Sequence, residues 1–311
     1  MKAVRIHDFG GTEVLHVEEV PTPRPGDDEV LIKVHAASVN PVDYKMRTGE
    51  FKGDGMTMPL TLGRDVSGTI EAIGANVFEF GRGDPVYAML DFDQGGYAEY
   101  VIAKASNVAH KPASVDHVHA AAVPLAAITA WQGLFDHGGL EAGERVLIHG
   151  AAGGVGHLAV QFAKHKGATV VATARADDIE LLRRLGADEV VDYENQKFED
   201  RVKDIDLVLD LVAGDTQRRS WKCLRKGGRM VSTLKAPSRF ESVIHGAKGE
   251  HFMAKPDRGE LEEIGRLIDG GEVKVVVQET LPLGQAAVAH DHLEHGHVRG
   301  KVVLEVATAD T

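Results

Sequence analysis

The sequence predicts an α/β protein in which a β-rich region precedes a doubly wound parallel sheet. Three observations support this fold class. Residues 1–116 contain short β-type runs separated by Pro and Gly, residues 117–253 alternate between strand-like and helix-like segments, and a glycine-rich turn joins one such strand to the next helix. The remaining residues, 254–311, differ in sequence pattern from both of these regions and form a third region.

Composition excludes several classes of protein. The 311 residues carry a net charge of −12, with 26% charged and 43% hydrophobic residues, as expected of a globular protein with a substantial core. An acidic chain does not favour nucleic acid as a partner, because phosphate binding needs clustered Lys and Arg. The single Cys, the lack of a long apolar run and the lack of an apolar signal core predict a cytoplasmic protein without a membrane partner.

The β-rich region is predicted from runs of β-branched residues. Val30–Val34 and Val66–Ile70 are expected strands, and Pro21, Pro23 and Pro25 stiffen the connection before the first of them. This pattern predicts a compact β domain.

The second region predicts a parallel sheet. Arg145–His149 is an expected buried strand, and Val155–Lys166 is an expected helix with apolar residues at helical spacing. The later expected elements are a strand at 169–173, a helix at 178–185 and strands at 206–209 and 229–232. Strands that alternate with helices form parallel sheets through right-handed crossovers.

The third region predicts two helices and a closing strand. Glu260–Ile268 has an apolar stripe, Gly284–Leu293 is a second expected helix, and Lys301–Val306 is strand-like. We expect this region to return to the first domain, although periodicity alone does not determine that topology.

The glycine-rich turn predicts dinucleotide binding. The segment from Gly150 to Gly156 reads Gly-Ala-Ala-Gly-Gly-Val-Gly and lies between an expected strand and an expected helix. Glycines allow the backbone to approach a pyrophosphate, and the helix start offers unpaired N–H groups. The predicted contacts are Gly150, Ala152, Gly153, Gly154, Val155 and Gly156. A plain tight turn is the alternative.

The end of the next strand favours NADPH over NADH. Thr173 closes that strand, and Arg175 lies where a basic residue would contact a 2′-phosphate. Asp177 and Asp178 complicate this interpretation, because an acid at the strand end would instead accept a hydrogen bond from the ribose of NADH. Their alternative role is to cap the following helix.

Motifs along nearly the whole chain resemble those of the medium-chain dehydrogenase/reductase superfamily. Within that superfamily, they are most similar to the zinc-free quinone oxidoreductase branch. The motifs are Ser38–Asp43, Gly63–Gly68, Gly95–Tyr100, Ala122–Trp131, the glycine turn, Leu185–Tyr193 and Gly300–Leu304. The resemblance implies a GroES-like catalytic domain built from 1–116 and 254–311, with an inserted Rossmann domain at 117–253. It also implies a cleft for cofactor and substrate, and a homodimer paired through a Rossmann edge strand.

The resemblance also implies catalytic and cofactor residues. Asn40 matches an asparagine of the substrate cleft, its alternative being a turn residue before Pro41, and Thr129 matches a residue beside the nicotinamide. The branch often has Tyr five positions after this asparagine, but this chain has Lys45 there, with Tyr44 before it. Both are candidates, although either could be solvated. Further cofactor candidates are Tyr193, Asp210, Val212, Ser232 and Thr233.

A zinc site is not expected. Zinc alcohol dehydrogenases of this superfamily have Cys near the Asn40 position and His in the turn that here contains Arg64. Arg64 and Asp65 are expected to form a structural ion pair. Cys223 is expected to be a buried, inert thiol. The four histidines His290, His292, His295 and His297 are expected to lie at a solvated helix end, because their spacing does not fit one helical face.

The sequence thus predicts a zinc-independent, NADPH-dependent reductase that transfers hydride to a quinone or an α,β-unsaturated carbonyl compound. Without a Lewis acid, an acceptor that is already electrophilic fits better than an alcohol. Two alternatives remain open: a reductase of another activated alkene, such as a haloacrylate or an enoyl thioester, and a non-catalytic NADPH-binding protein.

Overall fold

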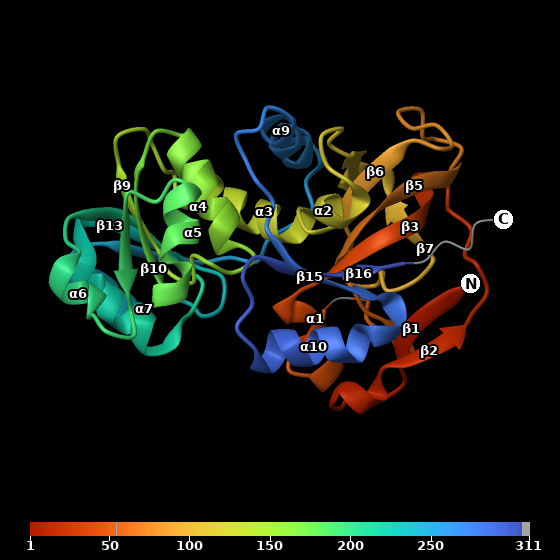
Figure 1. Ribbon diagram of the computed structural model, residues 1–311, viewed down its shortest axis with the longest axis horizontal. Coiled ribbons are helices and arrows are strands. Elements are labelled where there is room, and N and C mark those ends of the chain that lie inside the picture. Colours follow the sequence, from red (N-terminus) through yellow and green to blue (C-terminus); the bar gives the residue numbers. More distant parts are fainter. Residues whose placement is uncertain (54, 307–311) are drawn as a thin grey trace. The chain divides into compact units, whose positions relative to one another are not determined.

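The computed structural model describes residues 1–53 and 55–306, which form two compact units (Figure 1). Unit 1 contains residues 1–125, 256–271 and the chain from Val275 onward, and unit 2 contains residues 126–255 and 272–274. Unit 1 is therefore built from both ends of the chain, with unit 2 inserted between them.

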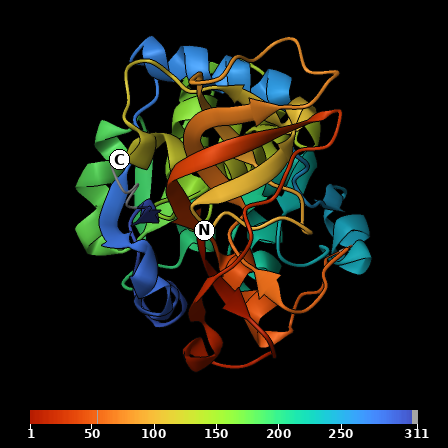
Figure 2. The ribbon, with the colours of Figure 1, turned by 90° about the vertical axis from the view of Figure 1, so that its right-hand side faces the viewer.

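Unit 1 contains two sheets, whose strands curve around a common apolar core (Figure 2). The smaller sheet has the order β2-β1-β4, with β1 at Lys2–Ile6, β2 at His16–Glu19 and β4 at Leu60–Thr61. The larger sheet has the order β15-β16-β3-β5-β6-β8, and β7 also pairs with β3. Its strands are β3 (Glu29–Val39), β5 (Asp65–Ile73), β6 (Pro85–Met89), β7 (Tyr100–Lys104), β8 (Val108–His110), β15 (Val277–Pro282) and β16 (Lys301–Glu305).

The closing strand joins the chain's end to the first region. β16 runs antiparallel to β3, with Val302 opposite Val39 and Leu304 opposite Ala37. All four of these apolar residues are buried in unit 1. The helices of this unit are α1 (Pro41–Thr48), α2 (His117–Ala121), α9 (Arg258–Asp269) and α10 (Ala286–His295). The two helices expected near the end of the chain therefore correspond to α9 and α10.

The boundary between the units differs from the expected one. Residues 117–125 belong to unit 1, although the strand–helix alternation placed them in the second domain. The reason is packing: Ala121 and Ala122 lie in a buried cluster with Ala36 of β3 and Val303 of β16. Conversely, residues 272–274 belong to unit 2, where the amide side chain of Gln161 bonds both backbone polar groups of Lys274.

Unit 2 is a six-stranded, all-parallel sheet with the order β11-β10-β9-β12-β13-β14. Numbered within the unit, the order is 3-2-1-4-5-6, which confirms the predicted Rossmann topology. Its strands are β9 (Arg145–Ile148), β10 (Thr169–Ala174), β11 (Glu189–Asp192), β12 (Ile205–Asp210), β13 (Leu224–Ser232) and β14 (Lys248–His251).

One helix precedes these strands, and the other helices of unit 2 follow or connect them. They are α3 (Pro124–Trp131), which begins at the boundary with unit 1, α4 (Gly156–His165), α5 (Ile179–Arg184), α6 (Phe198–Arg201), α7 (Gly214–Ser220) and α8 (Arg239–His245). The predicted helices at 155–166 and 178–185 are confirmed as α4 and α5, each shorter by one residue at each end. Asp178 occupies the N-cap position of α5.

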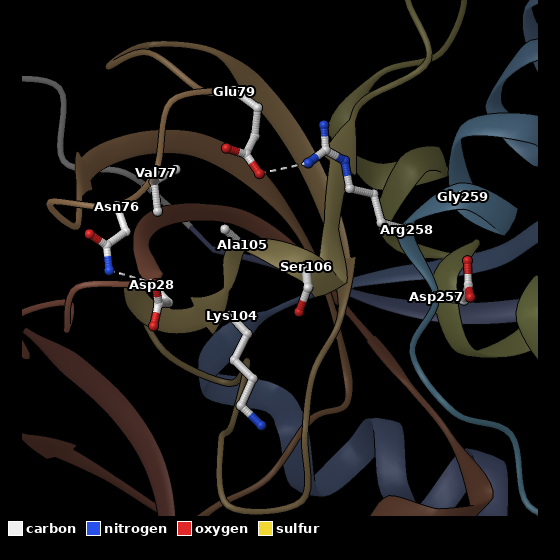
Figure 3. A pocket seen from close by; sticks show the side chains of 10 residues that line it. All are labelled: Asp28, Asn76, Val77, Glu79, Lys104, Ala105, Ser106, Asp257, Arg258 and Gly259. Atoms are coloured by element: carbon white, nitrogen blue, oxygen red, sulfur yellow. Dashed lines mark hydrogen bonds and ion pairs between the residues drawn. The ribbon is translucent and has the colours of Figure 1, made fainter.

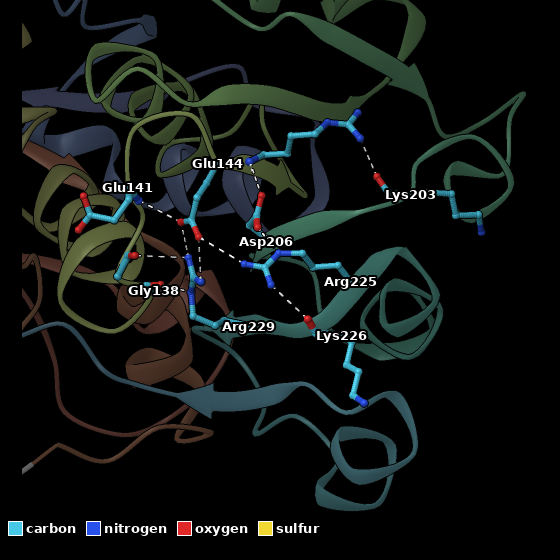
Figure 4. A network of polar contacts seen from close by, with 10 residues as sticks. Gly138, Glu141, Glu144, Lys203, Asp206, Arg225, Lys226 and Arg229 are labelled. Atoms are coloured by element: carbon cyan, nitrogen blue, oxygen red, sulfur yellow. Dashed lines mark hydrogen bonds and ion pairs between the residues drawn. The ribbon is translucent and has the colours of Figure 1, made fainter.

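Ion pairs join the strand starts of this sheet (Figure 4). The Glu144 carboxylate, just before β9, accepts from the Arg229 guanidinium of β13 through both oxygens, at 2.5 and 3.1 Å. Asp206 of β12 accepts from the Arg145 backbone N–H at 2.7 Å and pairs with Arg225. Charged groups thus link β9, β12 and β13 at the edge opposite the carboxyl ends of the strands.

No helix in residues 1–53 and 55–306 is long and apolar enough to span a membrane. Cys223 is buried, and burial raises the pKa of its thiol to about 12, so at neutral pH the sulfur is protonated and unreactive.

Candidate functional site

The glycine turn joins the end of β9 to the start of α4 and requires glycine at two positions. Gly150 has a φ of 66°, a left-handed conformation that favours glycine. A Cβ added to Gly156 would lie 2.2 Å from the carbonyl oxygen of Gly150 and 2.6 Å from the Cα of Ala151. Gly156 therefore allows the helix to start directly against the turn.

Gly153 leaves open space in front of the turn. Its N–H donates to the Gly150 carbonyl at 3.1 Å, and an added Cβ would meet only that carbonyl oxygen, at 3.4 Å. Gly154 and Val155 are half-buried, whereas Ala152 is buried. A shallow glycine surface at the first turn of a ten-residue helix, at the topological switch point between β9 and β12, fits a dinucleotide pyrophosphate.

Arg175 lies at the end of β10, beside the end of β11. Ala174 pairs with Asp192 in the parallel register, so the residues that follow them are neighbours. Arg175 Nε donates to the Tyr193 hydroxyl at 3.2 Å, and the same nitrogen lies 3.4 Å from a carboxylate oxygen of Glu194. The structure thus brings two predicted cofactor residues into direct contact, together with a carboxylate that the sequence analysis did not single out.

Thr173 has a different role from the one predicted for it. The residue is 3% exposed, and its hydroxyl lies 2.9 Å from Nδ1 of the buried His149. The other ring nitrogen of His149 contacts Ser220, whose hydroxyl donates to the Thr216 carbonyl. His149 Nε2 is therefore the donor, and Nδ1 accepts from Thr173. The Thr173 side chain thus links the end of β10 to the residue that follows β9 through a buried hydrogen bond.

Asp210 also acts inside the protein. Its buried carboxylate accepts from the Ser232 hydroxyl at 2.9 Å and from the backbone N–H groups of Val212 and Ala213 at 3.1 and 2.8 Å. Asp210 and Ser232 consequently shape the loop after β12, and this loop presents Val212 with 47% of its surface exposed. Thr233 follows β13, and its N–H donates to the Asp210 carbonyl at 3.4 Å.

In unit 1, Asn40 begins α1 and is almost completely buried. It forms a capping box with Asp43, whose carboxylate accepts from the Asn40 N–H at 2.8 Å. The side-chain NH₂ of Asn40 donates to Asp65 at 2.8 Å, and its carbonyl oxygen accepts from the Lys301 ammonium. An ammonium only donates and a carboxylate only accepts, so these two charges fix the orientation of the amide.

Asp65 pairs with Lys301, so the predicted Arg64–Asp65 ion pair is wrong. The carboxylate lies 3.6 Å from Lys301 Nζ, with both side chains at most 3% exposed. Arg64 instead lies over the Phe92 ring at 3.7 Å and donates to the Leu90 carbonyl at 2.6 Å. Arg64 lies just before β5, whereas Asp65 is the first residue of that strand, and the two side chains have different partners.

Asp43 continues this cluster toward α10. Its carboxylate accepts from the Tyr97 hydroxyl at 3.0 Å, and that hydroxyl lies 3.2 Å from Nε2 of His290. Arg47 contacts Nδ1 of His290 at 3.4 Å and pairs with Glu294 at 2.7 Å. Because Arg47 only donates, His290 carries its proton on Nε2 and donates to Tyr97.

Burial shifts the pKa values within this cluster. Desolvation raises the pKa of Asp43 to about 7, although bonds from Asn40 and Tyr97 oppose the rise. Desolvation and the nearby Arg47 charge lower the pKa of His290 to about 3. His290 is fully buried, which corrects the expectation of a solvated histidine group; His292 and His295, in contrast, form partly exposed pairs with Glu279 and Asp291.

The other catalytic candidates lie on two helices. Tyr44 and Lys45 are half-buried residues of α1 in unit 1, whereas Thr129 belongs to α3 in unit 2 and is 7% exposed. Burial, with the charges of Glu294 and Glu50, raises the pKa of Tyr44. Its phenol is therefore protonated at neutral pH and is available as a donor.

A separate hollow of about 580 Å³ lies in unit 1 (Figure 3). Both cations of its lining form ion pairs: Arg258 pairs with Glu79 at 2.8 Å, and Lys104 pairs with Asp91 at 2.9 Å. None of the predicted site residues lines it. Within the described residues, no group of three or more His, Cys, Asp or Glu side chains is arranged to hold a metal ion.

Comparisons with known proteins identify the family. Residues 26–113 match the alcohol dehydrogenase GroES-like domain, and residues 185–304 match a family described as zinc-binding dehydrogenase. The human mitochondrial NAD(P)H oxidoreductase RTN4IP1 is 37% identical over 326 residues, covering 90% of this chain and 82% of that protein. The chain belongs to the medium-chain dehydrogenase/reductase superfamily, in its quinone oxidoreductase branch.

The chain is also similar to two further relatives. The chloroplastic NADPH-dependent alkenal/one oxidoreductase of Arabidopsis thaliana is 36% identical and covers 98% of the chain and 79% of that protein. The Escherichia coli quinone oxidoreductase, solved with NADPH, superposes with a TM-score of 0.89 at 28% identity and covers 98% of this chain and 100% of that one. This member of the superfamily is accordingly an NAD(P)H-dependent oxidoreductase of the quinone oxidoreductase or alkenal reductase type.

Proposed function

We propose that this protein is a zinc-independent reductase that transfers hydride from NADPH to a quinone or an α,β-unsaturated carbonyl compound. The observation that carries the proposal is the open glycine turn of unit 2 together with the Arg175–Tyr193 pair at the neighbouring strand ends. The names of the relatives support this acceptor class.

The chain's own groups bind and orient the nucleotide. The turn from Gly150 to Gly156 offers backbone N–H groups to a pyrophosphate, and Arg175 offers a guanidinium to the 2′-phosphate. When bound, the nicotinamide supplies the hydride. Val212, Thr233 and Thr129 are proposed contacts on the nicotinamide side, while Asp210 positions the loop that carries Val212.

The acceptor needs a hydrogen-bond donor and a proton source. We assign the donor role to Tyr44, whose raised pKa keeps its hydroxyl protonated, and a supporting role to Lys45. Asn40 acts as a positioning residue, because its amide already bonds Asp65 and Lys301. The final proton comes from water or from the Tyr44 hydroxyl.

Zinc independence rests on the donor set around Asn40. Ser38, Asn40 and Arg64 stand where the zinc enzymes of the superfamily have Cys and His, and the buried Lys301 ammonium already neutralises Asp65. A second cation beside Lys301 and Arg64 would be repelled electrostatically. Treatment with a chelator is expected to leave activity unchanged, and a loss that zinc reverses would contradict this part of the proposal.

Oxidation of NADPH with matched panels of quinones and enones tests the acceptor class. Turnover with both panels or with one of them supports the proposal and identifies the substrate. Activity only with haloacrylates or enoyl thioesters would favour the activated-alkene alternative. Tight NADPH binding without any turnover would favour the non-catalytic alternative.

The substitution Arg175→Glu tests the cofactor preference. Loss of a charge-assisted bond to the 2′-phosphate and addition of a repulsive carboxylate should weaken NADPH binding about tenfold or more, with a much smaller effect on NADH. Titration calorimetry measures both dissociation constants. Arg218→Glu, on the exposed face of α7, is the control for the change in net charge. Equal weakening of both nucleotides would contradict the assignment.

We also propose a homodimer that pairs through β14. This outer strand of the parallel sheet has four exposed residues, and the neighbouring α8 exposes Phe240, Val243 and Ile244 at 73%, 81% and 59%. Unpaired strand edges and apolar helix faces are typical interaction surfaces. The cytoplasmic location also stays a prediction, because the two relatives described above are named mitochondrial and chloroplastic.

A further inference from the structure

Glu194 lies beside the proposed 2′-phosphate site and is held there by its own loop. The buried Asp192 carboxylate accepts from the Glu194 backbone N–H at 3.1 Å and from the Asn195 side chain at 2.7 Å. Tyr193 N–H donates to the Ala174 carbonyl at 3.1 Å, which ties the same loop to the end of β10. The backbone of Glu194 is thus fixed next to Arg175.

The contacts of Arg175 leave part of its guanidinium open. Nε donates to the Tyr193 hydroxyl at 3.2 Å and lies 3.4 Å from Glu194 Oε1. Within the described residues, these contacts involve Nε alone, so Nη1 and Nη2 stay available as the fork that binds a phosphate with two hydrogen bonds. The Arg175 and Glu194 side chains are 44% and 49% exposed, so a ligand can reach both of them.

We propose that Glu194 is a specificity-determining residue that weakens the binding of 2′-phosphorylated nucleotides and so narrows the preference for NADPH over NADH. This inference rests on the proposed function, because it assumes that Arg175 binds the 2′-phosphate. Two effects act in the same direction. The carboxylate offsets part of the guanidinium charge from the Nε side in the free protein, and it repels the phosphate dianion once that group is bound to Nη1 and Nη2.

The substitution Glu194→Gln separates this role from a structural one. The amide keeps the size of the side chain and removes its charge, so the Asp192-capped loop should be retained. Calorimetric titration of the full-length protein with NADPH, NADH, 2′,5′-ADP and 5′-AMP isolates the contribution of the 2′-phosphate. We expect NADPH and 2′,5′-ADP to bind about fivefold tighter to the variant, with NADH and 5′-AMP unchanged within about twofold.

A matched control removes an equivalent charge elsewhere in the same unit. Glu141 pairs with Lys166 at 3.4 Å, the same distance as that between Glu194 and Arg175, and its side chain is also exposed. Glu141→Gln should leave all four dissociation constants unchanged. High salt should reduce the difference between Glu194→Gln and the wild type, because both effects are electrostatic.

Several results would overturn the inference. Unchanged NADPH and 2′,5′-ADP affinities in Glu194→Gln would show that the carboxylate has no influence on the phosphate. Weaker binding of NADH and 5′-AMP would show that Glu194 instead accepts a hydrogen bond from the ribose 2′-hydroxyl. Binding of none of the four nucleotides to the wild-type protein would overturn the proposed function itself and this inference with it.

Discussion

At the scale of single residues, the orientation of Asn40 depends on two buried charges. Asp65 receives the amide N–H and Lys301 donates to the amide oxygen, and these two charged side chains are themselves almost completely buried. A buried charge is tolerated only with a partner, because removal from water costs several kcal/mol per ion. The last strand of the chain therefore organises the start of α1, which carries Tyr44 and Lys45.

Replacement of Lys301 by Met tests this dependence. The variant leaves Asp65 buried without its cation, so the free energy of unfolding should fall by about 3–5 kcal/mol. Lys104→Met is the matched control, because Lys104 pairs with Asp91 on the surface at 59% exposure and should contribute less than about 1 kcal/mol. Urea denaturation followed by circular dichroism measures both variants. Similar losses for the two would contradict the role of Lys301.

Asp43 predicts a pH dependence of stability. Its pKa is about 7 in the folded protein and near its ordinary value of 3.8 when unfolded. Between these values the folded chain holds a proton that the unfolded chain has released, so this residue makes the protein less stable as the pH rises from about 4 to 7. Its Oδ1 atom has no hydrogen-bond partner among the described residues, which adds to the cost of ionisation.

Asp43→Asn mimics the protonated acid and should remove this dependence. Relative to the wild type, the variant should gain about 3 kcal/mol of stability between pH 4.5 and pH 7.5. Urea midpoints of both proteins at the two pH values measure the difference, and the contributions of the other titrating groups cancel. Parallel pH curves for the two proteins would rule out a raised pKa at Asp43.

The sequence predicted which strand ends would bind the nucleotide, but not all the partners of the residues there. Arg175 and Tyr193 could be predicted because motif spacing locates them. Lys301, His290 and Glu194 were missed as site residues, since the first two meet their partners only through contacts between distant segments. The error at Arg64 and Asp65 has the same cause, because the cation that pairs with Asp65 is Lys301, which is distant in the sequence.

At the scale of elements, two glycines of the turn are expected to differ in role, because one affects stability and the other affects nucleotide binding. Gly156→Ala places a Cβ against the backbone of Gly150 and Ala151, whereas Gly153→Ala places one in nearly open space. The first substitution should therefore destabilise unit 2 by about 2 kcal/mol or more. The second should leave stability within about 0.5 kcal/mol but weaken nucleotide binding, because its methyl group occupies the approach to the pyrophosphate.

Thermal unfolding and NADPH titration together check this pair of variants. Gly153→Ala is expected to unfold at the wild-type temperature with a dissociation constant at least about fivefold higher. Normal NADPH affinity in Gly153→Ala would mean that the pyrophosphate binds elsewhere. Normal stability in Gly156→Ala would mean that the turn can relax around the added methyl group.

Elements with a buried face were predictable, and exposed ones were not. The strands β9, β10 and β12 are dominated by buried apolar residues and were expected. β14 (Lys248–His251) was missed because its sequence is polar, contains Gly and lies fully exposed at the edge of the sheet. Hydrophobic periodicity detects burial, so an edge strand held mainly by backbone hydrogen bonds gives no such signal.

At the scale of the whole molecule, the exposed edge of unit 2 predicts self-association. Analytical ultracentrifugation should show a dimer for the wild type. Val243→Asp, which places a charge on the exposed apolar face of α8, should shift the protein toward monomer. Phe78→Asp is the control, since Phe78 is an apolar residue that is 87% exposed and belongs to unit 1. A monomeric wild type would contradict the proposed homodimer.

The two tryptophans and the single cysteine are natural probes of unfolding, and all three belong to unit 2. Both tryptophans, Trp131 and Trp221, and the single thiol, Cys223, lie within residues 126–255. Indole emission and thiol-labelling kinetics therefore report on the nucleotide-binding unit alone, whereas far-ultraviolet ellipticity reports on both. An emission change that precedes the loss of ellipticity would reveal stepwise denaturation without any engineered label.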